Sequence, residues 1–234
     1  LGGINPQRTN DTTRSLFFAQ LASQGTWFTE ISLTNPNDGP LDVKLTALTE
    51  AGDIISSPSN PVVVRIPAWG QFNGRASDVF RFVQTQTLVG YVSAQVVNGS
   101  GGIFGHVAFG TTDGKALAAL PVQTQGSASM VFSQVAHGGL FFTGLTLLNF
   151  DAAHANVKIE VFDASGRSMG SVEETFRPGE KKARVISQIV PGVINQFDGY
   201  IKVTSDRPLI GFELFGGADL SFLAAVPPQT LSTA

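Results

Sequence analysis

The sequence of 234 residues has no cysteine, little charge, no excess of basic residues and no long hydrophobic run. Without cysteine the chain forms no disulfide and no thiolate metal site, and it has no cysteine nucleophile. Charged residues make up 14% of the sequence, against about 25% in an average globular protein, and the net charge is −3. This acidic balance argues against nucleic-acid binding. Because no apolar run approaches the roughly 20 residues of a spanning helix, we expect no membrane span.

Hydrophobic and turn-forming residues dominate what is present. Hydrophobic residues make up 42% of the chain, glycine numbers 26, and phenylalanine numbers 18. This composition is typical of a folded chain, since disorder needs low hydrophobicity and high net charge. The first 14 residues are polar, and we expect a flexible arm or an added edge strand there. The chain begins at Leu1 in place of Met, so we expect a processed form or a fragment.

The sequence is one unit written twice. Residues 18–35 match residues 132–149 without a gap, and residues 117–123 match residues 223–229 near the end of each copy. Between these segments the copies differ by gaps of a few residues, which fall among turn-forming residues and therefore in loops. We predict five segments: a polar N-terminal arm (1–14), a first repeat (15–123), a linker (124–128), a second repeat (129–229) and a tail (230–234).

Inside each repeat, residues alternate between two faces, a period of two that predicts β-strands. In residues 27–33 the odd-numbered positions share one face, and the second copy keeps the same phase. Turn signals, such as the one at residues 205–208, separate the runs, and helical turns are expected only at 77–83 and 187–190. Short strands with such turns favour a β-sandwich or a barrel. We predict about eight strands per repeat, in repeat 1 at 16–22, 26–35, 41–49, 61–66, 71–76, 88–97, 103–109 and 115–121.

Two patterns carry a resemblance to a known group of proteins. Phe-x-Gln-x-Ala-x-x-Gly-x-aromatic-Phe-Thr starts at Phe18 and again at Phe132, and Gly-Tyr-Ile-Lys-Val-Thr starts at Gly199. Both are similar to repeats of secreted and surface proteins of environmental bacteria, which are immunoglobulin-like β-sandwiches. The resemblance implies an all-β chain of two tandem, internally duplicated, immunoglobulin-like β-sandwich domains with about eight strands each. It also implies an extracellular or cell-surface location, and it carries over no catalytic residue.

Recognisable catalytic and metal-binding patterns are missing. The three histidines, at positions 106, 137 and 154, are not duplicated, and a zinc site needs convergent ligands. No Gly-x-Ser-x-Gly or His-Glu-x-x-His motif occurs. Asp113 and Asp219 are an acidic pair that recurs with its surroundings, and capping of a turn is favoured over a calcium site, which needs about six to eight oxygens. We therefore expect no metal and no cofactor.

Polar side chains that recur in both repeats are candidates for structural roles. Gln20 matches Gln134, and Asn35 matches Asn149. We predict that these four side chains make hydrogen bonds that tie turns and strand ends. Scaffold bonds have to recur in both copies, whereas a binding site need not.

Trp69 and Phe72 are the candidate ligand-binding residues. Trp69 lies in a loop where the second repeat has Arg-Pro-Gly-Glu, so the scaffold does not demand it. Together with Phe72 it is a candidate stacking platform for a sugar or a hydrophobic anchor, because aromatic residues are enriched in recognition surfaces. The alternative is that Trp69 packs against a neighbouring loop or domain.

These observations favour a non-enzymatic extracellular structural or adhesive module. In one version it is a subunit of a homopolymeric filament or layer, joined by strand addition through the N-terminal arm or a sheet edge. The alternative is carbohydrate binding through loop aromatics, and a third hypothesis is an enzyme with a cleft between the repeats. The expected partners are proteins, including further copies of the chain, or a glycan.

Overall fold

The computed structural model describes residues 12–230, which belong to two compact units. Unit 1 is Leu1–Gln125 and unit 2 is Gly126–Ala234. Strands account for 58% of the chain and helices for 4%, and the sheets are antiparallel, so the predicted all-β fold is confirmed. The predicted arm up to residue 11 and the tail from residue 231 lie outside the described residues.

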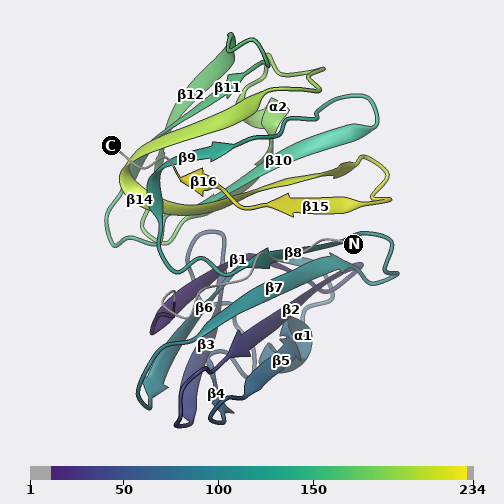
Figure 1. The fold of residues 1–234 in the computed structure, drawn as a ribbon. Helices are drawn as coiled ribbons and strands as arrows, with labels where there is room; N and C mark the ends of the chain where they lie inside the picture. The colour runs from purple at the N-terminus through teal and green to yellow at the C-terminus, as the bar shows by residue number, and fades with distance from the viewer. Residues whose placement is uncertain (1–11, 231–234) are drawn as a thin grey trace. The chain divides into compact units, whose positions relative to one another are not determined.

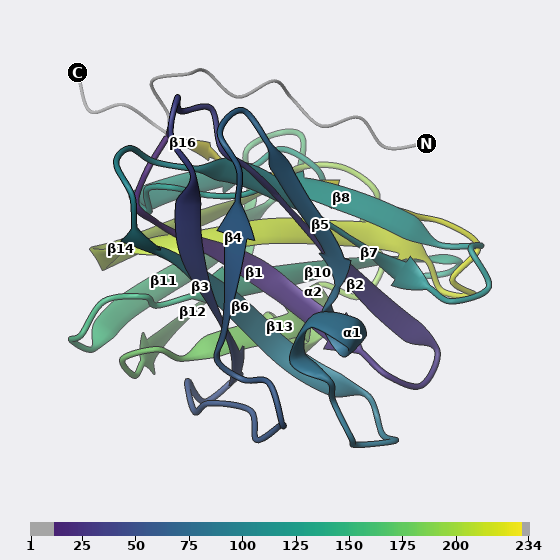
Figure 2. The ribbon, with the colours of Figure 1, turned by 90° about the horizontal axis from the view of Figure 1, so that it is seen from below.

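Unit 1 consists of two four-stranded sheets (Figures 1 and 2). Its elements are β1 (Ser15–Ser23), β2 (Trp27–Thr34), β3 (Leu41–Thr49), β4 (Val62–Ile66), β5 (Gln71–Arg75), α1 (Ala76–Phe80), β6 (Leu88–Asn98), β7 (Phe104–Thr111) and β8 (Leu117–Pro121). One sheet has the order β1-β6-β3-β4 and the other the order β5-β2-β7-β8. Each of the strands predicted for repeat 1 is present, with ends shifted by two residues or fewer.

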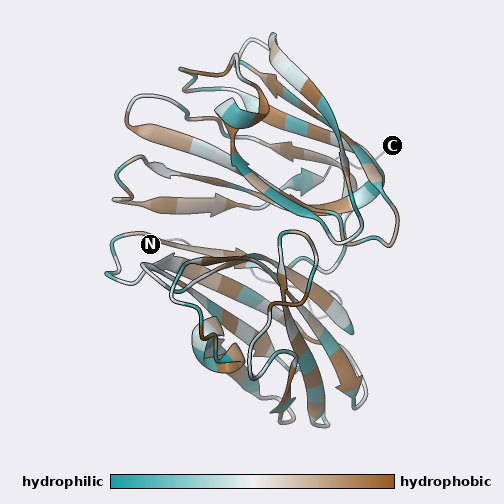
Figure 3. Cartoon of the chain, turned by 180° about the vertical axis from the view of Figure 1, so that it is seen from behind, coloured by the Kyte–Doolittle hydropathy of each residue, from teal (hydrophilic) through white to brown (hydrophobic). Residues whose placement is uncertain are grey.

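Alternation along the strands turns one face of each sheet inward. In β3, Val43, Leu45 and Ala47 are fully buried, while Asp42 and Lys44 are only partly buried. Figure 3 shows the same alternation as bands of brown and teal along the strands. Each fully buried aliphatic side chain of this size stabilises the fold by about 1.5–3 kcal/mol, so the inward faces form the core.

Unit 2 repeats this arrangement with one change. Its elements are β9 (Ser127–Phe132), β10 (Phe141–Leu148), β11 (Ala155–Phe162), β12 (Ser168–Phe176), β13 (Lys181–Val185), α2 (Ile186–Ile189), β14 (Tyr200–Gly217), β15 (Leu223–Val226) and β16 (Gln229–Thr230). The first half of β14 pairs with β9 and β11, and its second half pairs with β10 and β15. The single strand β14 therefore takes the place of both β6 and β7.

The predicted turn at residues 205–208 is wrong, because β14 runs through it. Only the register between β14 and β9 shifts there. Proline has no N–H to donate to a neighbouring strand, so Pro208 suits the point where β14 changes partners. In unit 1 the same connection is a separate loop over residues 99–103.

The strand order of unit 1 differs from that of an immunoglobulin domain. In an immunoglobulin domain the first two strands are neighbours in one sheet. In unit 1, β1 and β2 lie in different sheets. The tandem β-sandwich is therefore confirmed, whereas the immunoglobulin-like arrangement is not.

A single helical turn follows β5 in unit 1 and β13 in unit 2. These turns are α1 and α2, and each starts one residue before its predicted position. Ala76 and Phe80 of α1 are buried, as are Ile186 and Ile189 of α2. Both isoleucines belong to the apolar core of unit 2, so α2 extends that core beyond the sheets.

Buried asparagines fasten the turn that follows the second long strand of each repeat. Asn35 Nδ2 donates to three backbone carbonyls, those of Gly39 (2.9 Å), Ile66 (3.2 Å) and Pro67 (2.9 Å). Asn149 Nδ2 repeats the pattern at Ala153 (2.8 Å), Phe176 (3.4 Å) and Arg177 (3.1 Å). Each Oδ1 accepts the backbone N–H two residues ahead. The two side chains thereby tie each turn to the end of a neighbouring strand, at Ile66 and Pro67 in unit 1 and at Phe176 and Arg177 in unit 2.

A second duplicated device uses threonine. Thr29 Oγ1 accepts the N–H of Ala22 (2.9 Å) and donates to its carbonyl (2.8 Å). Thr143 makes the same two bonds with Ala136, at 2.8 Å and 2.9 Å. Both hydroxyls are buried, so each closes a gap in backbone pairing between neighbouring segments. The Phe-Thr pattern in the sequence reflects this requirement.

The first prediction concerns the asparagines. Asn35→Ala should destabilise unit 1, and Asn149→Ala unit 2, by roughly 1–3 kcal/mol each, because buried carbonyls lose their donors. Urea unfolding measures both, and since both tryptophans lie in unit 1, their fluorescence reports on that unit alone. The exposed Asn73→Ala is the control and should change stability by less than about 0.5 kcal/mol. Equal effects of the three variants would contradict the assignment.

Candidate functional site

Asp113 and Asp219 lie in the turns after β7 and β14. Each carboxylate accepts the backbone N–H two residues ahead, that of Lys115 (3.2 Å) and that of Ser221 (3.1 Å). Hydrogen bonds, first from the Thr111 hydroxyl and then from Lys115, lower the pKa of Asp113 to about 2. Hydrogen bonds from Ser221 likewise lower the pKa of Asp219. Both carboxylates are therefore ionised at neutral pH and stabilise their turns.

The duplicated glutamines occupy strand ends and irregularities. Gln20 is partly buried in β1, where the register with β6 shifts between Phe18 and Leu21. Gln134 is partly buried directly after β9. The hydrogen bonds predicted for these two side chains stay a prediction.

Trp69 and Phe72 do not form one platform. Trp69 sits in the turn between β4 and β5 and is 70% exposed. Phe72 is partly buried in β5, and its ring tip lies 3.1 Å from where a Cβ on Gly74 would be. The ring of Phe72 therefore extends along β5 away from the turn, and no ring contact joins it to Trp69 among the described residues.

Phe72 lies on β5, an edge strand of the unit 1 sandwich. By strand pairing its counterpart in unit 2 is Lys182, whose Nζ lies 2.9 Å from Glu174 and 4.2 Å from the centroid of the Phe176 ring. Arg184 also pairs with Glu174. These ion pairs join β12 to β13, which end the two halves of the unit 2 sandwich. At this edge of the sandwich, unit 2 thus has ion pairs where unit 1 has an aromatic ring.

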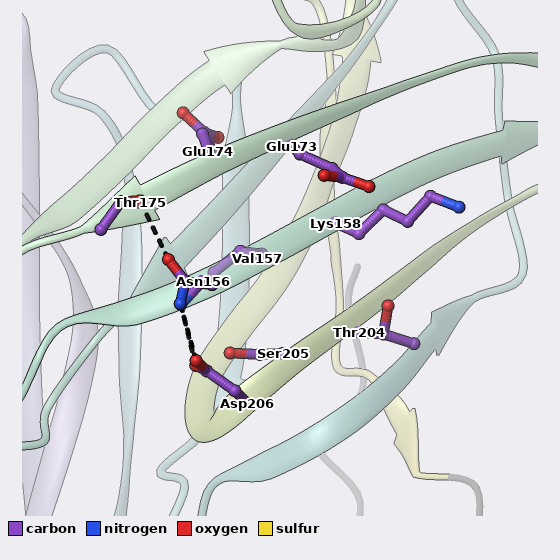
Figure 4. Close-up of a pocket in the computed structure, with 9 residues that line it drawn as sticks. All are labelled: Asn156, Val157, Lys158, Glu173, Glu174, Thr175, Thr204, Ser205 and Asp206. Atoms are coloured by element: carbon purple, nitrogen blue, oxygen red, sulfur yellow. Dashed lines mark hydrogen bonds between the residues drawn. The ribbon is translucent and has the colours of Figure 1, made fainter.

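A groove of about 590 Å³ opens on unit 2 along β11, β12 and β14 (Figure 4). It is lined by Asn156, Val157, Lys158, Glu173, Glu174, Thr175, Thr204, Ser205 and Asp206. Most of these side chains are polar or charged, and they come from three neighbouring strands.

Several polar groups of the groove already have partners, either inside the groove or beside it. Thr175 Oγ1 donates to Asn156 Oδ1 (3.1 Å), and Asn156 Nδ2 donates to Asp206 Oδ2 (2.8 Å), as the dashed lines in Figure 4 show. The Asn156 N–H also donates to Asp206 and, with that amide, lowers its pKa. Lys158 pairs with Glu160 at 2.8 Å, which raises the pKa of Lys158. A ligand would have to break these bonds to use the groups, so the groove is a weak candidate site.

Unit 2 also exposes five large apolar side chains on neighbouring loops and at the start of β10, and we call these five residues the loop cluster. Its members are Leu140 (78% exposed), Phe141 (40%), Ile194 (64%), Phe197 (56%) and Phe222 (37%). The Phe141 ring makes edge contacts with Phe197 and with Phe222, each with a centroid distance of 6.3 Å. Three phenylalanines from segments far apart in the sequence thus meet at one surface.

Backbone hydrogen bonds hold the loops of the cluster together. His137 and Gln196 exchange two bonds, with N···O distances of 2.7 Å and 2.9 Å. The N–H of Ala218 donates to the carbonyl of Leu140 at 2.8 Å. The three segments that carry the cluster are therefore tied to one another, and the apolar side chains are presented in a fixed arrangement.

Sequence reasoning missed the loop cluster, although a signal was present. In the alignment of the repeats, Thr26 and Ala116 of unit 1 stand where unit 2 has Leu140 and Phe222. The scaffold therefore does not demand large apolar residues at these positions. Exposed apolar groups that gather in one place mark interaction sites more often than exposed residues that stand singly.

Within residues 12–230, no group of three or more His, Cys, Asp or Glu side chains is arranged to hold a metal ion. No helix in the described part of the chain is long and apolar enough to cross a membrane. Burial lowers the pKa of His106 and that of His137, which favours the neutral imidazole at neutral pH.

The second prediction tests the charged edge of unit 2. Glu174→Gln should destabilise unit 2 by roughly 1–2 kcal/mol, because it leaves Lys182 and Arg184 without their shared, mostly buried partner. Its neighbour Glu173→Gln is the matched control, since Glu173 is exposed, and it should change stability by less than about 0.5 kcal/mol. Thermal unfolding at low and high salt measures the difference. Indistinguishable variants would refute the assigned role.

Comparison with known proteins identifies no family for this chain. No family model matches the chain, and no similar curated protein was found. The Thermotoga maritima protein 1070 aligns over 47% of this chain and 98% of its own, with 12% identity and a TM-score of 0.39. The Anabaena sensory rhodopsin transducer aligns over 38% and 95%, with 13% identity and a TM-score of 0.34. A β-glucuronidase of glycoside hydrolase family 2 aligns over 94% of this chain but 24% of its own, with 7% identity and a TM-score of 0.19. Similarities at this level assign neither a family nor a function.

Proposed function

We propose that this chain is a non-enzymatic structural or adhesive module of an extracellular or cell-surface protein, and that it binds further copies of itself. The observation that carries the proposal is the loop cluster, in which five large apolar side chains are exposed on hydrogen-bonded loops. Clustered aromatic residues supply much of the binding energy at protein interfaces. Because the loops are already tied together, the loop cluster itself loses little conformational entropy on binding.

Charge and composition favour the N-terminal arm of a second copy as the occupant. Asp198 and Asp219 lie within three residues of phenylalanines of the cluster, so an apolar partner segment with a basic residue is complementary. The arm has this composition, with Leu1, Ile4 and Arg8.

In the polymeric version of the proposal, the arm adds as a strand to a sheet edge of its neighbour. The strand β15 begins directly after Phe222, and among the described residues it pairs only with β14. An arm added along β15 would bring its apolar side chains to the loop cluster, combining backbone hydrogen bonds with side-chain burial. In its own copy, Thr13 pairs with Ile103, so the donated segment precedes this bridge.

The location in this proposal comes from the sequence resemblance. The patterns at Phe18, Phe132 and Gly199 are similar to immunoglobulin-like repeats of secreted and surface proteins of environmental bacteria. Such domains often occur in tandem on extracellular proteins, where structural and adhesive roles are expected.

The third prediction is that the chain self-associates through this surface. In analytical ultracentrifugation, the double variant Leu140→Ser with Phe197→Ser should weaken association at least about tenfold, or roughly 1.4 kcal/mol. Removal of residues 1–11 should weaken it similarly. The control is Trp69→Gly, which removes an exposed aromatic ring from unit 1 and should leave association unchanged.

Two results would refute this function. One is a wild-type chain that stays monomeric at every concentration tested. The other is association that persists unchanged in both the double variant and the shortened chain.

Carbohydrate binding is a second candidate function, favoured by the backbone at Trp69. Trp69 has a φ of +56°, a conformation that suits glycine, and unit 2 has Gly179 at the same turn position with a φ of +71°. A bulky residue kept in this conformation is strained, and such strain is often found at functional positions. The exposed ring is free to stack on a sugar.

The fourth prediction separates this candidate from the first. Trp69→Gly should relieve the strain and stabilise unit 1 by roughly 0.5–1 kcal/mol. The same variant should abolish every glycan signal on an array probed with the wild-type chain. No glycan signal from the wild type, or equal signals from both proteins, would eliminate the carbohydrate function.

A further inference from the structure

Glu213 lies inside the core of unit 2. It sits in the second half of β14, is 0% exposed, and pairs in register with Leu145 of β10 and Val226 of β15. Residues directly opposite each other on antiparallel strands point to the same face. Leu145 belongs to the apolar core of unit 2, so the Glu213 carboxyl points into that core as well.

Unit 1 has a valine at the same place. Val107 of β7 pairs with Ile31 and Leu120, which are the counterparts of the two residues that flank Glu213. Val107 is buried too, at 2% exposed. The two units therefore share the site, and they differ in whether an aliphatic group or a carboxyl fills it.

The carboxyl of Glu213 has no compensating partner. Neither of its oxygens makes a hydrogen bond to any of the described residues. An ionised carboxylate is far more costly to bury in this way than a neutral carboxylic acid. Burial accordingly raises the pKa of Glu213 to about 8.

No charge on the adjoining elements offsets this burial. β9, β10, β15 and α2 contain no ionisable residue. Lys158 of β11 pairs with Glu160, and Glu173 of β12 is exposed. Arg184 and Lys182 of β13 lie opposite Leu145 and Leu147, on the face that Glu213 shares, but both pair with Glu174. Lys202 of β14 pairs in register with Glu160, on the face away from the core.

The remaining ionisable groups near these strands lie on loops or point elsewhere. His137 precedes β10, and its Nδ1 accepts the N–H of Thr143, which keeps that nitrogen unprotonated. Asp198 and Asp219 are exposed on the loops around the cluster. Lys181 neighbours Lys182 on β13 and points to the opposite face.

We propose that Glu213 makes unit 2 pH-sensitive: the protonated carboxyl permits tight packing of β10, β14 and β15, and loss of the proton loosens these strands. Unit 1, with Val107 at the equivalent site, lacks this sensitivity. The inference goes beyond the proposed function and does not depend on it, because it concerns the fold of unit 2 and not a partner.

The direction follows from proton binding in the two states. In the unfolded chain Glu213 titrates near its ordinary pKa of 4.5, whereas in folded unit 2 its pKa is about 8. Between these values the folded state binds more protons than the unfolded state, so stability falls as pH rises. The contribution is fully present below about pH 4.5 and is lost as the pH passes about 8. The folded-to-unfolded ratio of unit 2 should fall by up to about tenfold per pH unit in this window.

Hydrogen exchange of the full chain, read by mass spectrometry between pH 5 and pH 9, tests the inference. Protection factors, from which the intrinsic pH dependence of exchange has been divided out, are compared for peptides of β10 and the second half of β14. The matched peptides of β2 and β7 in unit 1 are the internal reference. The variants are Glu213→Val, which installs the residue of unit 1, Glu213→Gln, which cannot ionise, and Val107→Glu, which adds a carboxyl at the equivalent site of unit 1.

The wild type should lose protection in unit 2 relative to unit 1 as the pH rises, by up to about tenfold per pH unit. Glu213→Val and Glu213→Gln should each abolish this relative loss, even if the glutamine variant is less stable throughout. Val107→Glu should produce the same loss in unit 1, while unit 2 keeps its own. A constant ratio between the units in the wild type, or the same loss in both Glu213 variants, would overturn the inference.

Discussion

Each unit holds two sheets face to face mainly by packing apolar side chains between them, since the chain has no cysteine for a cross-link. This packing requirement sets the alternation along the strands: on β3, Val43, Leu45 and Ala47 are fully buried, while Asp42 and Lys44 are only partly buried. It also leaves backbone groups at turns and crossings without strand partners. The buried Asn35 and Thr29, and their copies in unit 2, supply those partners.

Because the packing requirement acts equally on both copies, the positions where the copies differ are those that the scaffold leaves free. Trp69 stands where unit 2 has a glycine, and Leu140 and Phe222 stand where unit 1 has a threonine and an alanine. Glu213 differs from Val107 inside the core itself, at a thermodynamic cost that a neutral carboxyl keeps moderate. Residues that differ between the repeats are therefore the candidates for function, whereas residues that are identical in both repeats serve the scaffold.

Local patterns made most of the fold predictable from the sequence. The strands of unit 1 follow from alternation and turn residues, which act over a few positions, so their ends lie within two residues of prediction. The turn expected at residues 205–208 failed because the path of β14 is decided by its partners on two sheets, and Pro208 alone carries no such information.

The candidate sites were less predictable, because exposure depends on contacts between distant segments. Phe141, Phe197 and Phe222 meet only after three loops have been tied together. Glu213 resembled an ordinary strand carboxylate, since the residues on either side of it are apolar and hide the alternation. Its pairing with Leu145 was needed to show that it faces inward.

Site-specific photo-cross-linking of the chain under associating conditions tests whether the loop cluster contacts another copy. A benzophenone side chain in place of Phe197 should join one copy to the N-terminal arm of another, identified by mass spectrometry of the linked peptides. The same group in place of Val63, which is similarly exposed at 57% on unit 1, is the control. No cross-link between copies from position 197, or an equal yield from position 63, would contradict the account.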